Sequence, residues 1–206
     1  SAMIRALDRG VGQVMDALEA NGIADNTIVV LTSDNGGAAY IELSDINKPY
    51  RGWKLNHFEG GIHVPFMASW PNQIAAGTEV DTPIHHIDIF HTLAGAAGAA
   101  IPTDRTLDGI NFLPKLTGET ELLPARDLFW REGHQQSVLS DGWKLIRAES
   151  PTEPWLFHLS DDPTEQNNVA SKHPEKVKAL EALLAVHNAE QAAPMWPSIL
   201  NAPQFI

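Results

Sequence analysis

The sequence contains no cysteine, few basic residues and no long hydrophobic run. Without cysteine, disulfides, thiolate zinc sites and cysteine nucleophiles are excluded within these 206 residues. The 26 Asp and Glu residues outnumber the 14 Lys and Arg residues, which gives a formal net charge of -12 at pH 7. We therefore expect neither nucleic acid nor a membrane as a partner, because nucleic acid and anionic membranes bind basic surfaces. No apolar run approaches the roughly 20 residues that a membrane-spanning helix needs.

The first 125 residues have the pattern of an α/β domain. Apolar residues recur at helical spacing over residues 3–20, and residues 27–31 form a continuous β-branched and apolar run, which is typical of a strand buried on both faces. Residues 62–70 predict a second buried strand. Thr82-Pro83 resembles a helix N-cap followed by proline, so we expect a helix over residues 82–98.

The pattern changes near residue 126, where short apolar runs are separated by tight-turn signals such as Asp141-Gly142. This predicts a small antiparallel sheet with strands near 128–131, 137–139, 143–146 and 156–159. A last helix is expected over 174–190, followed by an extended, proline-containing tail over 193–206. The predicted division is therefore an α/β part over residues 1–125 and a sheet-plus-helix part over 126–206.

Asp34 and Asn35 directly follow the first predicted strand. Ligands of open α/β sheets bind beyond the carboxyl ends of strands, and carboxylate and carboxamide oxygens suit Ca²⁺ or Mg²⁺. The alternative is a simple Asn-Gly turn in a hairpin. No alternating strand follows Gly37, which favours the metal-site interpretation over the hairpin.

A second motif runs from Gly52-Trp53-Lys54 to Glu59-Gly60-Gly61. A lysine in a glycine-containing loop can meet an anionic oxygen as a compact point charge. Two consecutive glycines permit close backbone approach. The alternative is a solvated lysine beside an ordinary turn, which is the usual fate of a single lysine.

Together the two motifs resemble the sulfatase family of the alkaline-phosphatase superfamily. The family pattern is a strand ending in Asp-Asn-Gly, then Gly-x-Lys, then Glu-Gly-Gly-x-x-x-Pro, and here Lys54 precedes Glu59 by five residues. His63 occupies a position that is often Arg in the family. The stretches 88–93 and 156–168 resemble the family's next helix and closing strand and turn.

The resemblance implies an alkaline-phosphatase-like α/β sheet and hydrolysis of sulfate esters. Asp34 and Asn35 would be two ligands of one divalent cation, Ca²⁺ or else Mg²⁺. Because two ligands are too few for such a cation, we expect it to be absent or weakly bound in this chain. Lys54 would be catalytic and contact a sulfate oxygen, since preorganised cations stabilise developing charge. His57, in the Lys54 loop, is a further candidate for substrate binding, and His63 is an alternative. The three histidines His85, His86 and His91 show no zinc-site spacing, and we expect them at the surface or half-buried.

The resemblance also implies a nucleophile that the sequence does not contain. The family uses a formylglycine formed from Cys or Ser in a Cys/Ser-x-Pro-x-Arg motif, and no such motif occurs here. We therefore expect the 206 residues to correspond to the C-terminal part of a sulfatase, inactive alone. We also expect the chain to form a homo-oligomer or to need an N-terminal half. The alternatives are a phosphonate or phosphodiester hydrolase of the same superfamily, and a non-catalytic interaction module.

Overall fold

The chain divides into two compact units in a computed structural model that describes residues 2–43, 45–193 and 195. The first unit comprises Ser1–Leu31 and Phe66–Pro124, and the second comprises Thr32–Pro65 and Ala125–Ile206. Residues 32–65 therefore group with the residues from Ala125 onward. The division into residues 1–125 and 126–206 stays a prediction. Most of the tail over residues 193–206 lies outside the described residues.

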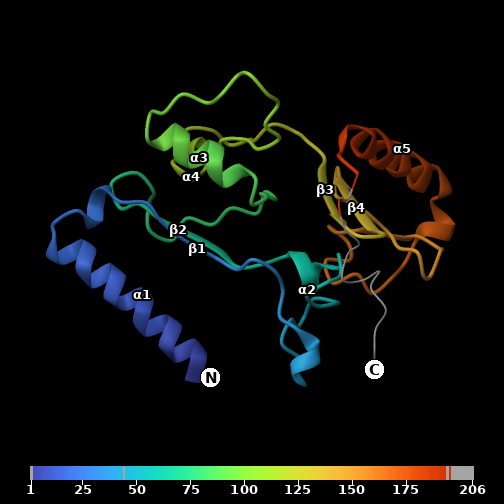
Figure 1. Cartoon of the computed structure of the whole chain (residues 1–206), viewed down its shortest axis with the longest axis horizontal. Coiled ribbons are helices and arrows are strands. Elements are labelled where there is room, and N and C mark those ends of the chain that lie inside the picture. The colour runs from blue at the N-terminus through green and yellow to red at the C-terminus, as the bar shows by residue number, and fades with distance from the viewer. Residues whose placement is uncertain (1, 44, 194, 196–206) are drawn as a thin grey trace. The chain divides into compact units, whose positions relative to one another are not determined.

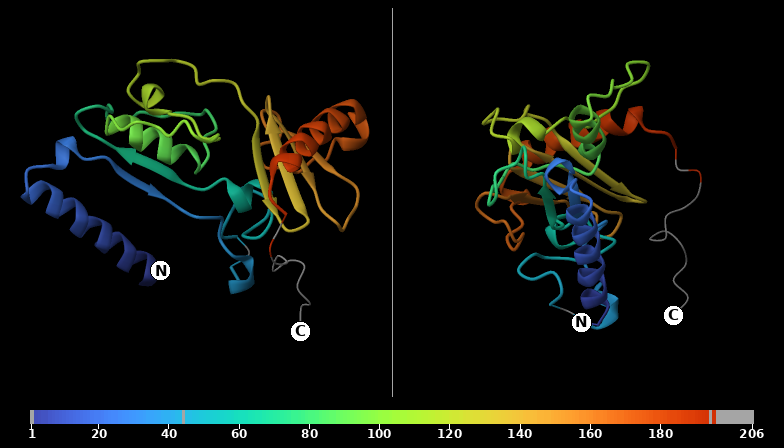
Figure 2. Two further views of the ribbon diagram at one scale, coloured as in Figure 1. Left: turned by 45° about the horizontal axis from the view of Figure 1, so that its top comes forward. Right: turned by 90° about the vertical axis from the view of Figure 1, so that its left-hand side faces the viewer.

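The first unit contains a two-stranded sheet of β1 (Val29–Thr32) and β2 (Phe66–Ser69). One side of this sheet carries α3 (Asp88–Ala96) and α4 (Leu113–Leu116), as both views show (Figures 1 and 2). Apolar side chains from these elements surround a small cavity, among them Val30, Phe66, Ile89, Leu93 and Phe112. A strand predicted over residues 27–31 is thus present with slightly shifted bounds, but it is not buried on both faces of the sheet, because Leu31 is 37% exposed.

Helix α1 (Ala2–Ala20) and the short 3-10 helix η1 (Ala24–Asn26) precede β1. The apolar stripe that predicted α1 is present, but none of its residues is buried. Met3 is 85% exposed and Ile4 is 71% exposed. Amphipathic spacing therefore specified the helix correctly, while its apolar face is covered only in part, at Val11, Met15 and Leu18.

Two predicted element boundaries in the first part are wrong. The helix expected from Thr82 begins only at Asp88, because the buried Asp88 carboxylate accepts hydrogen bonds from the His85 N–H at 2.7 Å and the Ile110 N–H at 3.0 Å. These bonds fix a non-helical turn ahead of α3. The strand expected over 62–70 is limited to β2, because residues Glu59–Ile62 form a helical turn, α2.

The second unit is built on a four-stranded antiparallel sheet in the order β3-β4-β5-β6. The strands are β3 (Leu128–Glu132), β4 (Gln135–Ser140), β5 (Trp143–Arg147) and β6 (Trp155–His158). Helix α5 (Pro174–Glu190) lies across one face of this sheet (Figure 1). The short 3-10 helices η2 (Ala39–Ile41) and η3 (Ala170–Lys172) complete the unit. The antiparallel sheet and the last helix are confirmed.

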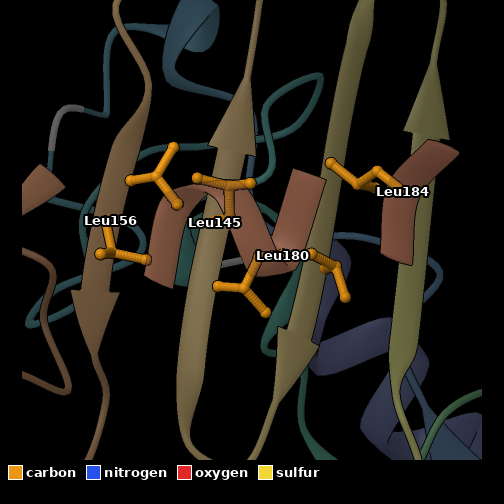
Figure 3. Close-up of a cluster of buried hydrophobic side chains, with 6 residues drawn as sticks. Leu145, Leu156, Leu180 and Leu184 are labelled. Carbon is orange, nitrogen blue, oxygen red and sulfur yellow. The ribbon is translucent and has the colours of Figure 1, made fainter. Parts of the chain in front are cut away.

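The hydrophobic core of the second unit lies between the sheet and α5. Figure 3 shows Leu145 and Leu156 of the sheet pointing toward Leu180 and Leu184 of α5. Val138 and Val177 complete this cluster of buried side chains. Burying one such leucine contributes roughly 1.5–3 kcal/mol, so this cluster provides the unit with its own apolar core.

Within the described part of the chain, no helix is long and apolar enough to cross a membrane.

Candidate active site

Asp34 and Asn35 lie in a loop directly after β1, as the sequence predicted. Asp34 is exposed, and its Oδ1 accepts a hydrogen bond from the Asn35 N–H at 2.9 Å. Asn35 is half-buried, and its Nδ2 donates to the Gly36 carbonyl at 3.1 Å. The loop continues without a returning strand, so the hairpin alternative does not apply. Two hard oxygen donors therefore stand side by side at a strand end.

Hydrogen bonds join the loop that contains Lys54 to the loop that contains Asp34 and Asn35. The Lys54 N–H donates to the Gly37 carbonyl at 3.1 Å. The Asn47 side chain accepts from the Gly37 N–H at 2.7 Å and donates to the carbonyls of Gly37 and Gly52 at 2.9 and 3.1 Å. One carboxamide thus ties both loops together. Lys54 is not a partner in the ion pairs found among the described residues.

Glycines let three backbone segments meet at this point. The Gly36 N–H donates to the Gly61 carbonyl at 2.8 Å, and the Gly60 N–H donates to the Arg51 carbonyl at 2.7 Å. A Cβ placed on Gly36 would lie 1.8 Å from the Gly60 carbonyl oxygen, and one on Gly61 would lie 2.0 Å from the Asn56 carbonyl oxygen. Only glycine fits such contacts, so the Gly60-Gly61 pair brings the loops of Asp34 and Lys54 together.

His57 lies in the Lys54 loop but is turned inward. It is 5% exposed, and its Nδ1 is 3.1 Å from the Ser137 Oγ on β4. Burial, together with the charge of Lys144, lowers the pKa of His57 to about 4. The imidazole is therefore neutral at pH 7 and cannot donate a proton as an imidazolium. Contact between His57 and substrate stays a prediction, and its burial favours a supporting role.

A buried ionic cluster lies beneath α2 and is formed by Glu59, Lys144 and Glu165. The Lys144 Nζ on β5 is 2.6 Å from Glu59 Oε1 and 2.9 Å from Glu165 Oε1. The Glu59 N–H donates to the Glu165 carboxylate, so this carboxylate sits at the start of α2. His63 extends the cluster to the surface, with its Nδ1 2.7 Å from Glu59 Oε2.

The two carboxyl groups of this cluster differ in pKa. Burial alone would raise the pKa of Glu59, but the hydrogen bonds and charges of His63 and Lys144 outweigh it, and the pKa is lowered. Burial raises the pKa of Glu165, which the charge of Lys144 only partly offsets. The hydrogen bond to Glu59 raises the pKa of His63. Glu59 is therefore the carboxyl group whose anionic form Lys144 and His63 favour.

Sequence reasoning missed Asn47, Lys144 and Glu165. Glu165 belongs to the Asp-Pro-Thr-Glu stretch that resembled the family's closing turn, so a signal for it was present. Lys144 and Asn47 carried no comparable signal. A lysine within a short strand is normally assigned to a solvent-facing position, and an asparagine in an irregular loop to a turn.

The chain matches two family profiles. "Sulfatase" matches residues 1–99, and "N-sulphoglucosamine sulphohydrolase, C-terminal" matches residues 52–190. The chain belongs to the sulfatase family and corresponds to the C-terminal part of a sulfatase. The sulfatase family uses a metal ion. Asp34 and Asn35 have the right chemistry for two of its oxygen ligands, whereas the described residues contain no group of three or more His, Cys, Asp or Glu that could hold a metal.

Known sulfatases align with most of this chain. Steryl-sulfatase of Rattus norvegicus is 36% identical over 178 residues, which cover 82% of this chain and 30% of the relative. N-acetylgalactosamine-6-O-sulfatase of Bacteroides thetaiotaomicron is 30% identical over 206 aligned residues, covering 88% of this chain and 40% of the relative. This chain therefore spans well under half the length of these relatives.

Solved sulfatase structures share the fold. The crystal structure of Ps i-CgsB in complex with k-i-k-neocarrahexaose matches with a TM-score of 0.84 and 27% identity, covering 95% of this chain and 44% of that chain. A Bacteroides thetaiotaomicron structure, BT33336S-sulf, described with the metabolism of glycosaminoglycans, matches with a TM-score of 0.76 and 28% identity, covering 89% and 43%. The expected α/β class and alkaline-phosphatase-like fold are thus confirmed.

Proposed function

We propose that this chain contributes one side of an active site that hydrolyses sulfate esters. Asp34 and Asn35 provide two oxygen ligands to a divalent cation, Ca²⁺ or else Mg²⁺, and Lys54 provides a cation for the sulfate oxygens. The observation that carries the proposal is the pair of backbone hydrogen bonds, Lys54 N–H to Gly37 carbonyl and Gly36 N–H to Gly61 carbonyl, which hold both loops together.

The chemistry follows from the charge that a sulfate ester develops as its S–O bond breaks. Negative charge grows on the leaving oxygen and the sulfuryl oxygens, and a fixed ammonium facing it stabilises the transition state more than the ground state. A bound metal would supply Lewis-acid stabilisation of the same oxygens. The chain's own contribution is to hold Lys54 and the Asp34-Asn35 donors at a fixed spacing.

The absence of a Cys/Ser-x-Pro-x-Arg motif limits what these residues do alone. Cations without a nucleophile leave the difficult step unassisted, so the 206-residue chain should hydrolyse no sulfate ester by itself. Activity belongs to a complete sulfatase that contains this sequence. The names of two relatives refer to a steroid and to a sugar. A substrate screen should therefore start with sulfate esters of steroids and sugars.

The test is Lys54→Ala in the complete sulfatase, with Lys48→Ala as the matched control. Lys48 lies in the same unit, 70% exposed and paired with Asp45 at 2.9 Å. With an aryl sulfate as substrate, Lys54→Ala should lower kcat/KM by about 100-fold or more, as removal of one transition-state donor does elsewhere. Lys48→Ala should change it by less than about twofold.

Two outcomes would overturn the proposal. Unchanged kcat/KM in Lys54→Ala would remove that residue from the mechanism. A preference of the wild type for the matched aryl phosphate over the aryl sulfate would replace sulfatase activity with that of a phosphoryl hydrolase.

A further inference from the structure

Lys144 is an unusual residue for the middle of a sheet. It lies on β5 next to the core residue Leu145, and its side chain is 0% exposed. A lysine is almost never fully buried unless it is paired, because removing the ammonium from water is costly. Its partners, Glu59 and Glu165, come from segments about 20 residues or more away, and none of the three is among the residues proposed to touch substrate.

The cluster fixes the start of α2 from two directions. The Glu59 side chain is held by the Lys144 ammonium, and the Glu59 N–H is held by the Glu165 carboxylate. The Glu165 carbonyl also accepts a hydrogen bond from Arg51 Nη1 at 3.1 Å, and the Arg51 guanidinium lies 4.2 Å from the Phe58 ring centroid. Residues 51, 58 and 59 are therefore anchored to the same point.

That anchor connects directly to the proposed site. The two residues after Glu59 are Gly60 and Gly61, whose backbone groups bond to Arg51 and Gly36. A shift of Glu59 would carry both glycines with it, and no side chain there could absorb the movement. Lys144 and the Asp34 and Lys54 loops are thus linked through α2 by contacts that have little room to adjust.

We propose that Lys144 is a positioning residue that sets the placement of the Asp34-Asn35 and Lys54 loops through Glu59. The inference rests on the proposed function for its catalytic consequence, although the link between Lys144 and the loops is a property of this chain alone. Without the ammonium, Glu59 and Glu165 would face each other as buried like charges. One would then become protonated or move, and α2 would lose its fixed position.

The test is hydrogen exchange on the 206-residue chain, comparing wild type with Lys144→Met, which keeps much of the volume and removes the charge. Amides of residues 34–37 and 51–62 should exchange at least tenfold faster, while those of β3 and α5 should change by less than threefold. Lys176→Met is the matched control, since Lys176 lies in the same unit and its ammonium is 5.3 Å from the Trp143 ring centroid. It should leave both sets of amides unchanged.

Two further variants separate positioning from general loss of stability. Lys144→Arg retains a cation and should restore most of the protection. Should Lys144→Met fail to fold, Glu165→Gln takes its place, and faster exchange at the Glu59 amide is the expected result. The proposal would be overturned if the loop amides of Lys144→Met, or of Glu165→Gln, exchanged at the same rates as in the wild type.

Activity of the complete sulfatase gives an independent readout. Lys144→Met should lower kcat more than it raises KM, because misplaced loops lose transition-state contacts, whereas Lys144→Arg should recover activity. If the loops loosen in the chain but no sulfate ester is hydrolysed by the wild-type enzyme, the proposed function fails and the positioning role stands. If the wild type is active and Lys144→Met retains its kcat, the positioning role fails.

Discussion

The two units of this chain differ in how they bury their apolar residues. In the second unit, Leu145 and Leu156 are completely buried against α5. In the first, α1 has a well-formed apolar stripe and buries none of it. The sheet and helix of the second unit follow each other along the chain and complete a core by themselves. The loops of the proposed site belong to that unit, so their geometry depends on the better packed part of the chain.

A pair of identical substitutions tests this comparison directly. Leu145→Ala should cost about 3 kcal/mol of unfolding free energy, because the leucine is fully buried and leaves a cavity. Leu7→Ala on α1, where the leucine is 62% exposed, should cost no more than about 0.5 kcal/mol. Urea unfolding followed by tryptophan fluorescence measures both. Equal losses would mean that α1 is covered in solution, as self-association of the chain would do.

The second prediction concerns pH and the two histidines beside the ionic cluster. The folded-state pKa of His57 is about 4, below its ordinary value of 6.5. As pH falls, His57 therefore binds a proton in the unfolded chain before it does so in the folded chain. The stabilisation that results from the lowered pKa is present above pH 6.5 and is lost as pH falls toward 4. The loss amounts to about 3 kcal/mol at 1.36 kcal/mol per unit. The contribution of His63 to stability depends on pH in the opposite way. Because its pKa is raised in the folded chain, the stabilisation is fully present below pH 6.5 and is lost as pH rises through the folded-state pKa.

Unfolding free energies of single variants at pH 7 and pH 4 separate the two histidines. His57→Asn should reduce the pH-dependent loss by about 3 kcal/mol. His63→Gln should increase it slightly, since the His63 side chain is 53% exposed and also faces Lys144 and Glu165. A pH profile of His57→Asn that overlays the wild type would show that His57 is not buried neutral.

The third prediction uses one glycine from each unit. Gly36→Ala should destabilise by about 2 kcal/mol, because the new methyl group would meet the Gly60 carbonyl at 1.8 Å. Gly10→Ala on α1 meets nothing within 4 Å and should stabilise by roughly 0.5–1 kcal/mol through helix propensity. Thermal unfolding of both variants gives the two signs. A neutral Gly36→Ala would mean that the loops separate more easily than their hydrogen bonds indicate.

Local signals in the sequence predicted most of the secondary structure. The four strands of the second unit and α5 have apolar spacing and turn residues that act over a few positions, and all were placed within two residues. The placement of Asp34 and Asn35 at a strand end followed from the same kind of pattern. These features need no information from distant parts of the chain.

The remaining features depend on partners that are distant in sequence. Residues 59–62 form a helical turn because Glu59 bonds to Glu165, 106 positions later. The burial of Lys144 depends on Glu59, 85 positions earlier, so its strand position alone suggested solvent. The late start of α3 likewise depends on an interaction between Asp88 and Ile110. His57 was expected at the site because it lies in the same loop as Lys54. Side chains of one loop can nevertheless point in opposite directions.

The three glycines at the meeting point of the loops also set which positions of this chain a mutant library could vary. Positions 36, 60 and 61 accept a single amino acid, since every other side chain begins with a Cβ that would overlap a carbonyl group. Trp53, in contrast, is 46% exposed and adjoins Lys54. A mutant library aimed at new substrates should therefore keep the three glycines constant and randomise position 53, where variation alters the surroundings of the lysine without moving the backbone that carries it.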